Sequence, residues 1–276
     1  MSKLIKMEFY RFFTSKTIRF GIIFACLVAA AYMFFSLGIV KLVEFAGESD
    51  PELYVSMMGL DILLSQLSWA GGVDFADVVI AGTGAFSLFI GCMMTASFIG
   101  SEQSSKYTKN FAGQLPNRGY TAISKFVVTS AAHILILVIY TIVSSVLAVV
   151  LLGNVISGYN IGTLLGGLGL RVLLHLAINA AIVFICTLTK SHAVAMVVGS
   201  IFGIGVTRLV YMILGMILSV MKVNFPIGEY MPDGINSQLS AGNVGELALK
   251  GVLVSLGFII VFVGANYMLT RKRDVR

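Results

Sequence analysis

Charged side chains are scarce in this chain: they make up 12% of its residues, whereas about a quarter of a typical soluble domain is charged. Hydrophobic residues reach 58% and are gathered into runs about as long as the ~20 residues needed to cross a lipid bilayer. This balance excludes an ordinary soluble fold. It predicts an all-α, polytopic membrane protein with a single transmembrane domain over residues 1–276.

Cysteines are few, and the usual catalytic and nucleotide-binding motifs are missing. Cys26, Cys92 and Cys186 lie far apart in apolar runs and form no C-x-x-C pair, so neither a disulfide nor a metal site is expected. The sequence contains no G-x-x-x-x-G-K-[ST], H-E-x-x-H or G-x-S-x-G motif, and no pair of carboxylates within its apolar runs. We therefore expect a chain that is not an enzyme on its own and binds no cofactor.

Six apolar segments are long enough to be transmembrane helices: residues 19–40, 78–99, 126–152, 163–188, 193–218 and 247–269. In or beside them, Gly162/Gly166 and Gly199/Gly203 form G-x-x-x-G pairs, which permit two helices to approach closely. The chain is thus expected to cross the membrane six times.

Lysines and arginines are concentrated at one set of span ends, and this predicts the orientation. Most of the 19 basic residues lie before the first span, between the second and third, between the fourth and fifth, and after the last. The alternate connections hold most of the carboxylates. Because loops rich in Lys and Arg stay in the cytosol, both termini are expected to be cytosolic, in a bacterial cytoplasmic membrane. The net charge of +6 then needs no nucleic acid to explain it.

Residues 1–17, ahead of the first span, have the pattern of an amphipathic helix. Apolar side chains recur with helical spacing at Ile5, Phe9, Phe12 and Phe13. Polar side chains fall on the opposite side: Lys3, Lys6, Glu8, Arg11 and Ser15. This predicts a helix that lies in the cytoplasmic membrane interface, in contact with lipid, before the chain turns into the bilayer. A frayed basic tail is the alternative.

Two connections on the acidic side of the membrane are long. In residues 41–77, the triplet Asp50, Pro51 and Glu52 is a helix start, and the apolar spacing after it predicts an outer amphipathic helix. Residues 219–246 contain prolines and glycines and too few apolar residues to span. They predict broken or re-entrant helix over the outer end of the bundle.

Polar residues inside the predicted spans are the main candidates for a translocation path: Arg171, His175, Asn179 and Arg208. The first three recur every four residues and share one stripe of the fourth span, while the last lies in the fifth. An arginine within a membrane costs roughly 2.5–3.5 kcal/mol, so each should face a partner, water or the bundle interior. Two interpretations stay open: a polar lining of the path, or structural pairing with loop carboxylates such as Asp74 and Asp77.

The basic-side connection at residues 101–125 is long, hydrophilic and of mixed charge. Its candidates for contact with a partner protein are Glu102, Ser105, Lys109, Phe111, Leu115 and Arg118. A short helix over 102–113, followed by a turn at 116–119, is expected. This loop is therefore the candidate attachment point for a cytoplasmic partner, and an idle connector is the alternative.

Two segments resemble the membrane subunits of type-two ATP-binding-cassette exporters. The start, MSKLIKMEFYRFFTSKTIRF, is similar to the amphipathic elbow helix that leads into the first span in that family. The loop SEQSSKYTKNFAGQLPNRGYTAISK resembles the family's pattern of an acidic residue, a small residue, Leu and Pro, a basic residue and a lysine entering the third span. The matching positions are Glu102, Ser105, Leu115, Pro116, Arg118 and Lys125.

The resemblance implies a permease subunit of an ATP-driven exporter. In that family the loop is a coupling helix seated in a groove of a separate cassette ATPase, two copies of which bind ATP and Mg. Two permeases, here this chain and a second copy or a related chain, enclose the path. The elbow-first start looks most like Gram-positive exporters of amphipathic or antimicrobial peptides. A secondary transporter and a non-transport immunity or assembly component are the alternatives.

Overall fold

The computed structural model describes residues 2–46, 73–104, 117–154, 156–222 and 225–272. Its elements in chain order are α1 (Ser2–Thr14), α2 (Lys16–Ala46), β1 (Val73–Asp74), α5 (Phe75–Thr83), α6 (Ala85–Ser104), α8 (Gly119–Leu152), β2 (Ile156–Gly158), α9 (Ile161–Thr189), α10 (His192–Ile204), α11 (Thr207–Val220), η2 (Ile227–Tyr230), α12 (Pro232–Gln238), η3 (Ala241–Asn243) and α13 (Val244–Lys272). Most of these residues are helical, which confirms the predicted all-α class apart from two short strands.

Five stretches of helix in the described ranges are long and apolar enough to cross a membrane: Lys16–Gly38, Phe75–Glu102, Gly119–Leu152, Ile161–Thr189 and Ala241–Lys272. They correspond to five of the six spans that the sequence predicts. The remaining span corresponds to α10 and α11, which together pass the same test but are bent.

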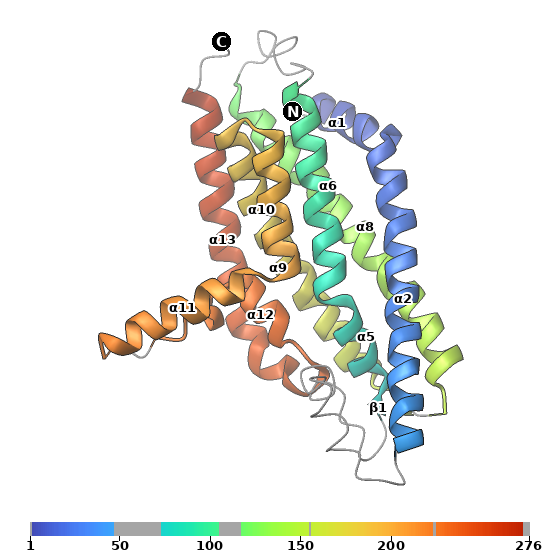
Figure 1. The fold of residues 1–276 in the computed structure, drawn as a ribbon. Coiled ribbons are helices and arrows are strands. Elements are labelled where there is room, and N and C mark those ends of the chain that lie inside the picture. Colours follow the sequence, from blue (N-terminus) through green and yellow to red (C-terminus); the bar gives the residue numbers. More distant parts are fainter. Residues whose placement is uncertain (1, 47–72, 105–116, 155, 223–224, 273–276) are drawn as a thin grey trace.

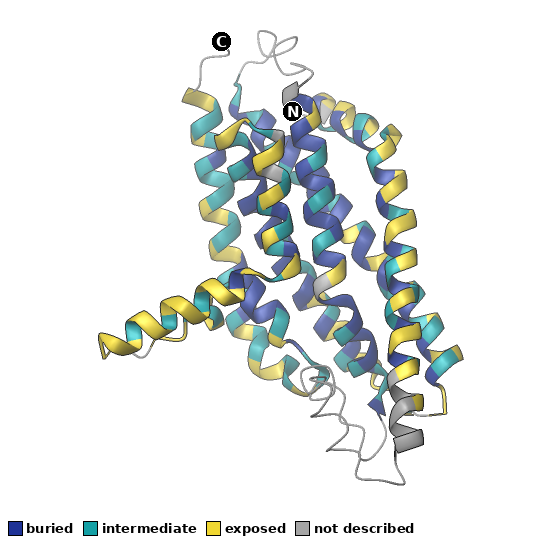
Figure 2. Ribbon diagram, viewed as in Figure 1, coloured by how far each residue is buried: buried dark blue, intermediate teal, exposed yellow. Residues whose placement is uncertain are grey.

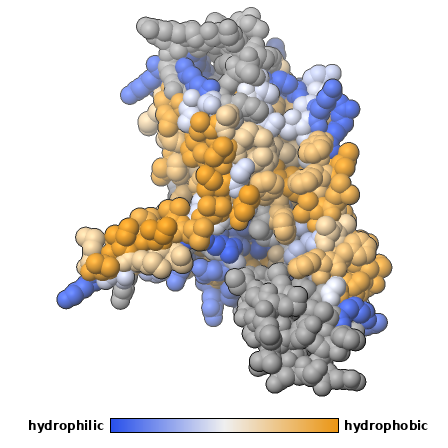
Figure 3. Space-filling model, viewed as in Figure 1, coloured by the Kyte–Doolittle hydropathy of each residue, from blue (hydrophilic) through white to orange (hydrophobic). Residues whose placement is uncertain are grey.

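The surface of the bundle is apolar and its interior is partly polar, the reverse of a soluble protein. Phe20, Leu27 and Phe34 of α2, with Leu249 and Ile260 of α13, each expose more than half of their surface. Figures 2 and 3 show exposed, hydrophobic faces along the bundle. Buried polar side chains lie on α6, α8 and α9: Thr95, Glu102, Thr129, His133, Ser144, Arg171, His175 and Asn179. This arrangement identifies a membrane-embedded protein.

α1 and the last turn of α13 lie at the same end of the bundle, at the top of Figure 1, which we call the terminal end. The opposite, distal end holds α5, α12 and the parallel pairing of β1 with β2. Helix α6 runs through the middle of the bundle and packs against α2, α8, α9 and α10. Its polar side chains can therefore meet those of several neighbours.

The prediction of one continuous helix over 193–218 is wrong. Helix α10 ends at Ile204, Gly205 adopts a left-handed conformation with φ of 82°, and α11 leaves at an angle of 72°. Glycine enters this conformation at little steric cost, so it terminates α10. Helix α11 then projects away from the bundle (Figure 1), and most of its length is exposed (Figure 2).

Glycines on α10 bring that helix close to α6. A Cβ atom added to Gly199 would lie 3.2 Å from the carbonyl oxygen of Cys92, and one added to Gly203 would lie 2.5 Å from the Cα atom of Phe89. The close approach expected of this G-x-x-x-G pair is therefore confirmed. The pair in the fourth span makes no such backbone contact with another described helix.

The connection between α11 and α13 consists of short helical pieces in its described part. The elements η2, α12 and η3 are each far too short to cross a bilayer. They lie at the distal end, near the base of α11 (Figure 1). The amphipathic helix predicted after Asp50 lies outside the described residues.

Candidate functional site

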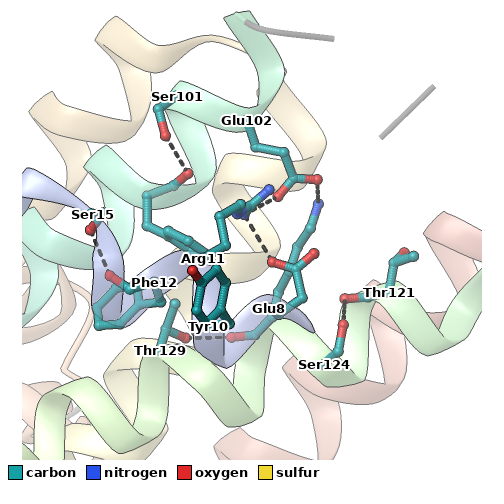
Figure 4. Close-up of polar contacts among 12 residues, drawn as sticks. Glu8, Tyr10, Arg11, Phe12, Ser15, Ser101, Glu102, Thr121, Ser124 and Thr129 are labelled. Carbon is teal, nitrogen blue, oxygen red and sulfur yellow. Dashed lines mark hydrogen bonds and ion pairs between the residues drawn. The ribbon is translucent and has the colours of Figure 1, made fainter. Parts of the chain in front are cut away.

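Four charged side chains meet at the terminal end, where α1, α6 and α8 come together (Figure 4). Arg11 Nη2 lies 2.9 Å from both Glu102 Oε2 and Glu8 Oε2. Lys125 Nζ lies 2.8 Å from Glu102 Oε1. The Glu102 side chain is fully buried and that of Lys125 nearly so. We call these four residues the ionic cluster.

Aromatic contacts reinforce the ionic cluster. The ring of Phe12 meets that of Phe98 edge to face, with 4.8 Å between the centroids. The Arg11 guanidinium lies 4.3 Å from the centroid of the same Phe98 ring. Phe98 and Glu102 are one turn apart on α6, so both contacts act on one face of that helix. Helix α1 is therefore fixed to α6 by an ion pair and an apolar contact at once.

The buried face of α1 differs from the face that the sequence predicts. Leu4, Glu8 and Phe12, four residues apart, are buried against the bundle. Three of the predicted apolar residues are half-buried or exposed: Ile5, Phe9 and Phe13. Placing Glu8 on the outward polar face was wrong, because its carboxylate is accommodated inside by Arg11. The spacing of apolar residues does not reveal this ion pair between Glu8 and Arg11.

The Glu8 carboxyl group has a pKa raised to about 7 from its ordinary value of 4.5. Burial, which penalises the charged form, is the main cause, and the neighbouring Glu102 adds to it, while Arg11 and Lys125 act in the opposite direction. At pH values between 4.5 and about 7, Glu8 holds a proton in the folded chain that it has released in the unfolded chain. The free energy of unfolding therefore falls as the pH rises through this window.

Replacing Glu8 with glutamine is expected to remove this pH dependence. The variant should melt several degrees above the parent chain at pH 8 and close to it at pH 5, because glutamine carries no charge to bury. Thermal unfolding of the purified chain in detergent between pH 5 and 8 measures the difference. Glu246→Gln, at an exposed position, is the control. A Glu8→Gln variant that is destabilised equally at both pH values would show that the charged pair with Arg11 dominates.

Two of the six predicted coupling residues lie in the described chain. Glu102 belongs to the ionic cluster, and Arg118 is half-buried at the start of α8. Beside it, the Asn117 side chain accepts a hydrogen bond from the Gly119 amide at 2.9 Å and donates one to the Tyr267 hydroxyl at 2.6 Å. The other four lie outside the described residues: Ser105, Lys109, Phe111 and Leu115. The described part of the loop is thus anchored on α1, α8 and α13.

The predicted stripe of α9 faces the interior of the bundle, and Arg171, His175 and Asn179 are each at most 1% exposed. The Asn179 Nδ2 group donates to Thr129 Oγ1 at 2.9 Å and to Ser130 Oγ at 3.1 Å. Its Oδ1 atom accepts a hydrogen bond from a hydroxyl group of α6. A fully paired amide of this kind holds three helices together.

A pair of buried histidines continues this polar interior. The rings of His175 and His133, from α9 and α8, are 6.0 Å apart and nearly perpendicular. His133 Nε2 lies 3.2 Å from Thr95 Oγ1. Nearer the terminal end, Thr129 Oγ1 donates to the Lys125 carbonyl oxygen at 2.8 Å. We call this series of buried polar groups, from the ionic cluster to Arg171, the polar column.

Arg171 joins three elements at the distal end of the polar column. Its Nη1 group donates to the Ile80 carbonyl oxygen and to the Thr83 hydroxyl. Its Nε and Nη2 groups donate to the side-chain and backbone oxygens of Asn236, at 3.1 and 3.4 Å. All these acceptors are uncharged. The guanidinium therefore ties α9 to α5 and α12, and within the described ranges it forms no ion pair with a carboxylate.

The described partners of Arg171 do not include Asp74 or Asp77, the loop carboxylates named as examples for a structural role. Asp74 accepts a hydrogen bond from the Ala76 amide at 2.7 Å, as the N-cap of α5. Asp77 accepts one from the Ala241 amide at 2.8 Å. Both carboxylates thus accept hydrogen bonds from backbone amides at the starts of short helices, where the helix itself supplies no acceptor.

Arg208, at the start of α11, lines a cavity of about 90 Å³ together with Arg171. This cavity, which we call the distal pocket, is lined by residues of α5, α6, α9, α12 and the corner between α10 and α11. Asp233 and Asn236 supply further polar groups. Two arginines from different predicted spans therefore share one site. Arg208 is exposed, whereas Arg171 is buried.

Several residues of these sites escaped the sequence analysis: Thr83, Thr95, His133, Asp233 and Asn236. Thr95 and His133 lie in long apolar runs. Lys125, Thr129 and His133 recur every four residues, which is the same signal that identified the polar stripe of α9. Asn236 gives no comparable signal, because it lies in a polar, glycine-containing connection.

No protein-family model matches this sequence, and no curated protein matches it with significance. Within the described ranges, no three His, Cys, Asp or Glu side chains lie together in a way that would hold a metal ion.

Proposed function

We propose that this chain is the permease subunit of an ATP-driven exporter of the type-two ATP-binding-cassette class. It crosses a bacterial cytoplasmic membrane six times, with both termini cytosolic and α1 as an interfacial elbow helix. It pairs with a second permease and is driven by two copies of a separate ATPase that bind ATP and Mg. The common end of α1 and α13 supports an even number of crossings, with α10 and α11 supplying the sixth.

The ionic cluster is the observation that carries this proposal. Glu102 lies in the last turn of α6, which precedes residues 105–116, and Lys125 lies in the second turn of α8, which follows them. Arg11 links Glu102 to α1. A push on the loop by an ATPase would therefore reach the elbow helix and two spans together, because separating a buried ion pair is costly.

The same geometry gives Glu102 a specific role within the proposal. Its buried carboxylate cannot touch a cytoplasmic partner while it is paired with Arg11 and Lys125. We assign to Glu102 the task of holding the root of the coupling loop, and to Lys109 and Phe111, further along the loop, the contact with the ATPase. The acidic residue in the resembling motif thus acts as a structural link.

A loop exchange tests the proposal. Residues 106–115 are replaced by a Gly/Ser linker of equal length, which spares Glu102, Arg118 and the ionic cluster. We expect the parent chain to co-purify with a cassette ATPase from its native host, and the exchange to reduce the recovered ATPase at least tenfold. The melting temperature should change by no more than a few degrees. Undiminished recovery of the ATPase, with export intact, would refute the coupling role.

A secondary transporter is the second candidate, and the buried pair of His133 and His175 favours it. Such imidazoles are groups that can carry protons inside a membrane. Proteoliposomes that contain the purified chain alone separate the two candidates. Substrate movement driven by a pH gradient without ATP would favour the secondary transporter, whereas movement that requires the ATPase and ATP supports the exporter.

A further inference from the structure

The distal pocket carries an excess of positive charge. Three charged side chains line it: Arg171, Arg208 and Asp233. The two carboxylate oxygens of Asp233 accept hydrogen bonds from the hydroxyl groups of Thr207 and Tyr211, the latter at 2.8 Å. In the part of the chain that the structure describes, neither arginine belongs to an ion pair. One net positive charge in the pocket is therefore left without a counter-ion.

The two arginines differ in a way that suits ligand binding. Arg171 is 1% exposed and is held by uncharged acceptors, so its guanidinium is a fixed positive wall. Arg208 is exposed on the first turn of α11 and keeps its donors free for a ligand in the described structure. In surroundings of low dielectric constant, such a pair attracts an anion strongly and disfavours a cation.

The pocket adjoins an apolar surface. Along α11, Leu209, Met212, Ile213 and Met216 expose between 53% and 58% of their surface. Figure 3 shows this strip as a continuous hydrophobic projection, with hydrophilic surface directly below its base. Arg208 lies at that base. A polar site and an apolar platform are thus continuous, and together they match a molecule with a charged head and an apolar chain.

We propose that the distal pocket binds the anionic headgroup, a carboxylate or a phosphate, of a membrane amphiphile whose apolar chain lies along α11. A cavity of about 90 Å³ suits a single headgroup and not a peptide chain. The positive pocket also repels cationic peptides. That such amphiphiles are the exported substrate rests on the proposed function. Their binding to the distal pocket does not depend on it.

Direct binding to the purified full-length chain, without ATPase, tests the proposal. The chain is placed in nanodiscs of zwitterionic lipid, and the probes are a fluorescent fatty acid, a fluorescent alkyl phosphate and the matching alkyl alcohol. We expect the two anionic probes to bind at least tenfold more tightly than the alcohol. Arg208→Gln should weaken the binding of the anionic probes about tenfold and leave the binding of the alcohol unchanged. The anionic probe that binds more tightly identifies the headgroup.

Lys222→Gln is the matched control, because it removes one exposed positive charge from the far end of α11. If both variants lose the same affinity for the anionic probes, the probes are attracted by general surface charge, and the distal pocket is not their binding site. Unlabelled alkyl phosphate should displace the anionic probes. If inorganic phosphate or an acidic peptide displaces them equally well, the claim that the ligand is an amphiphile is overturned. Since no ATPase takes part, these outcomes are independent of the loop exchange that tests the exporter.

Discussion

Replacement of Arg171 with methionine is expected to lower the free energy of unfolding by about 2–4 kcal/mol. Methionine fills a similar length with an apolar chain, but it donates no hydrogen bonds. The Thr83 hydroxyl, the Ile80 carbonyl and the Asn236 side chain would then lose a buried donor. Helix α12 would lose its hydrogen bonds to the Arg171 side chain of α9, so the distal end should loosen first.

Thermal unfolding in detergent, followed by size-exclusion profiles, measures this effect. Arg171→Lys should fall between the parent chain and Arg171→Met, because an ammonium group keeps the charge but cannot make the forked set of bonds. Arg208→Gln is the control, since its side chain is exposed in the same pocket and should leave the melting temperature almost unchanged. Equal melting temperatures for Arg171→Met and the parent chain would show that the guanidinium does not hold the distal end.

The features that sequence predicts well here are local. Five spans could be located because the length of an apolar run in the sequence gives the length of the helix that crosses the membrane. The common orientation of Arg171, His175 and Asn179 toward the interior follows from the period of the helix. That a second helix approaches α10 closely was likewise predicted from Gly199 and Gly203, but its identity as α6 comes from the structure. In each case, the physical cause lies within a few residues of the pattern.

Contacts between distant residues were not predictable. Asn236 meets Arg171 across 65 residues, and Glu102 meets Arg11 across 91. Nothing in the spacing of Glu8 indicates that its charge is balanced inside the bundle, so amphipathic pattern alone assigned it outward. The bend at Gly205 also escaped prediction, since glycines inside apolar runs commonly continue a helix. Tertiary partners decide all of these features, and a single sequence does not record them.

Glu102→Gln is expected to destabilise the terminal end by about 3 kcal/mol, because it removes the buried counter-ion of Lys125 and one of the two carboxylates paired with Arg11. Glutamine retains the shape, so the loss reports charge and not volume. We expect α1 to detach from α6 more readily. In the proposed exporter, ATP hydrolysis should then continue while substrate movement falls, because the loop and the elbow helix no longer move together.

Glu229→Gln supplies a matched comparison for this prediction. Glu229 pairs with Lys250 at 2.7 Å, about the same distance as Glu102 from Lys125, but both side chains of this pair are solvent-accessible. An exposed pair contributes about 0–1 kcal/mol, so Glu229→Gln should change the melting temperature little. Double electron–electron resonance measures the distribution of distances between spin labels on α1 and α8. This distribution should broaden in Glu102→Gln and stay narrow in Glu229→Gln. If both variants melt alike and the label distance stays narrow, the ionic cluster is not the link between the loop and the elbow helix.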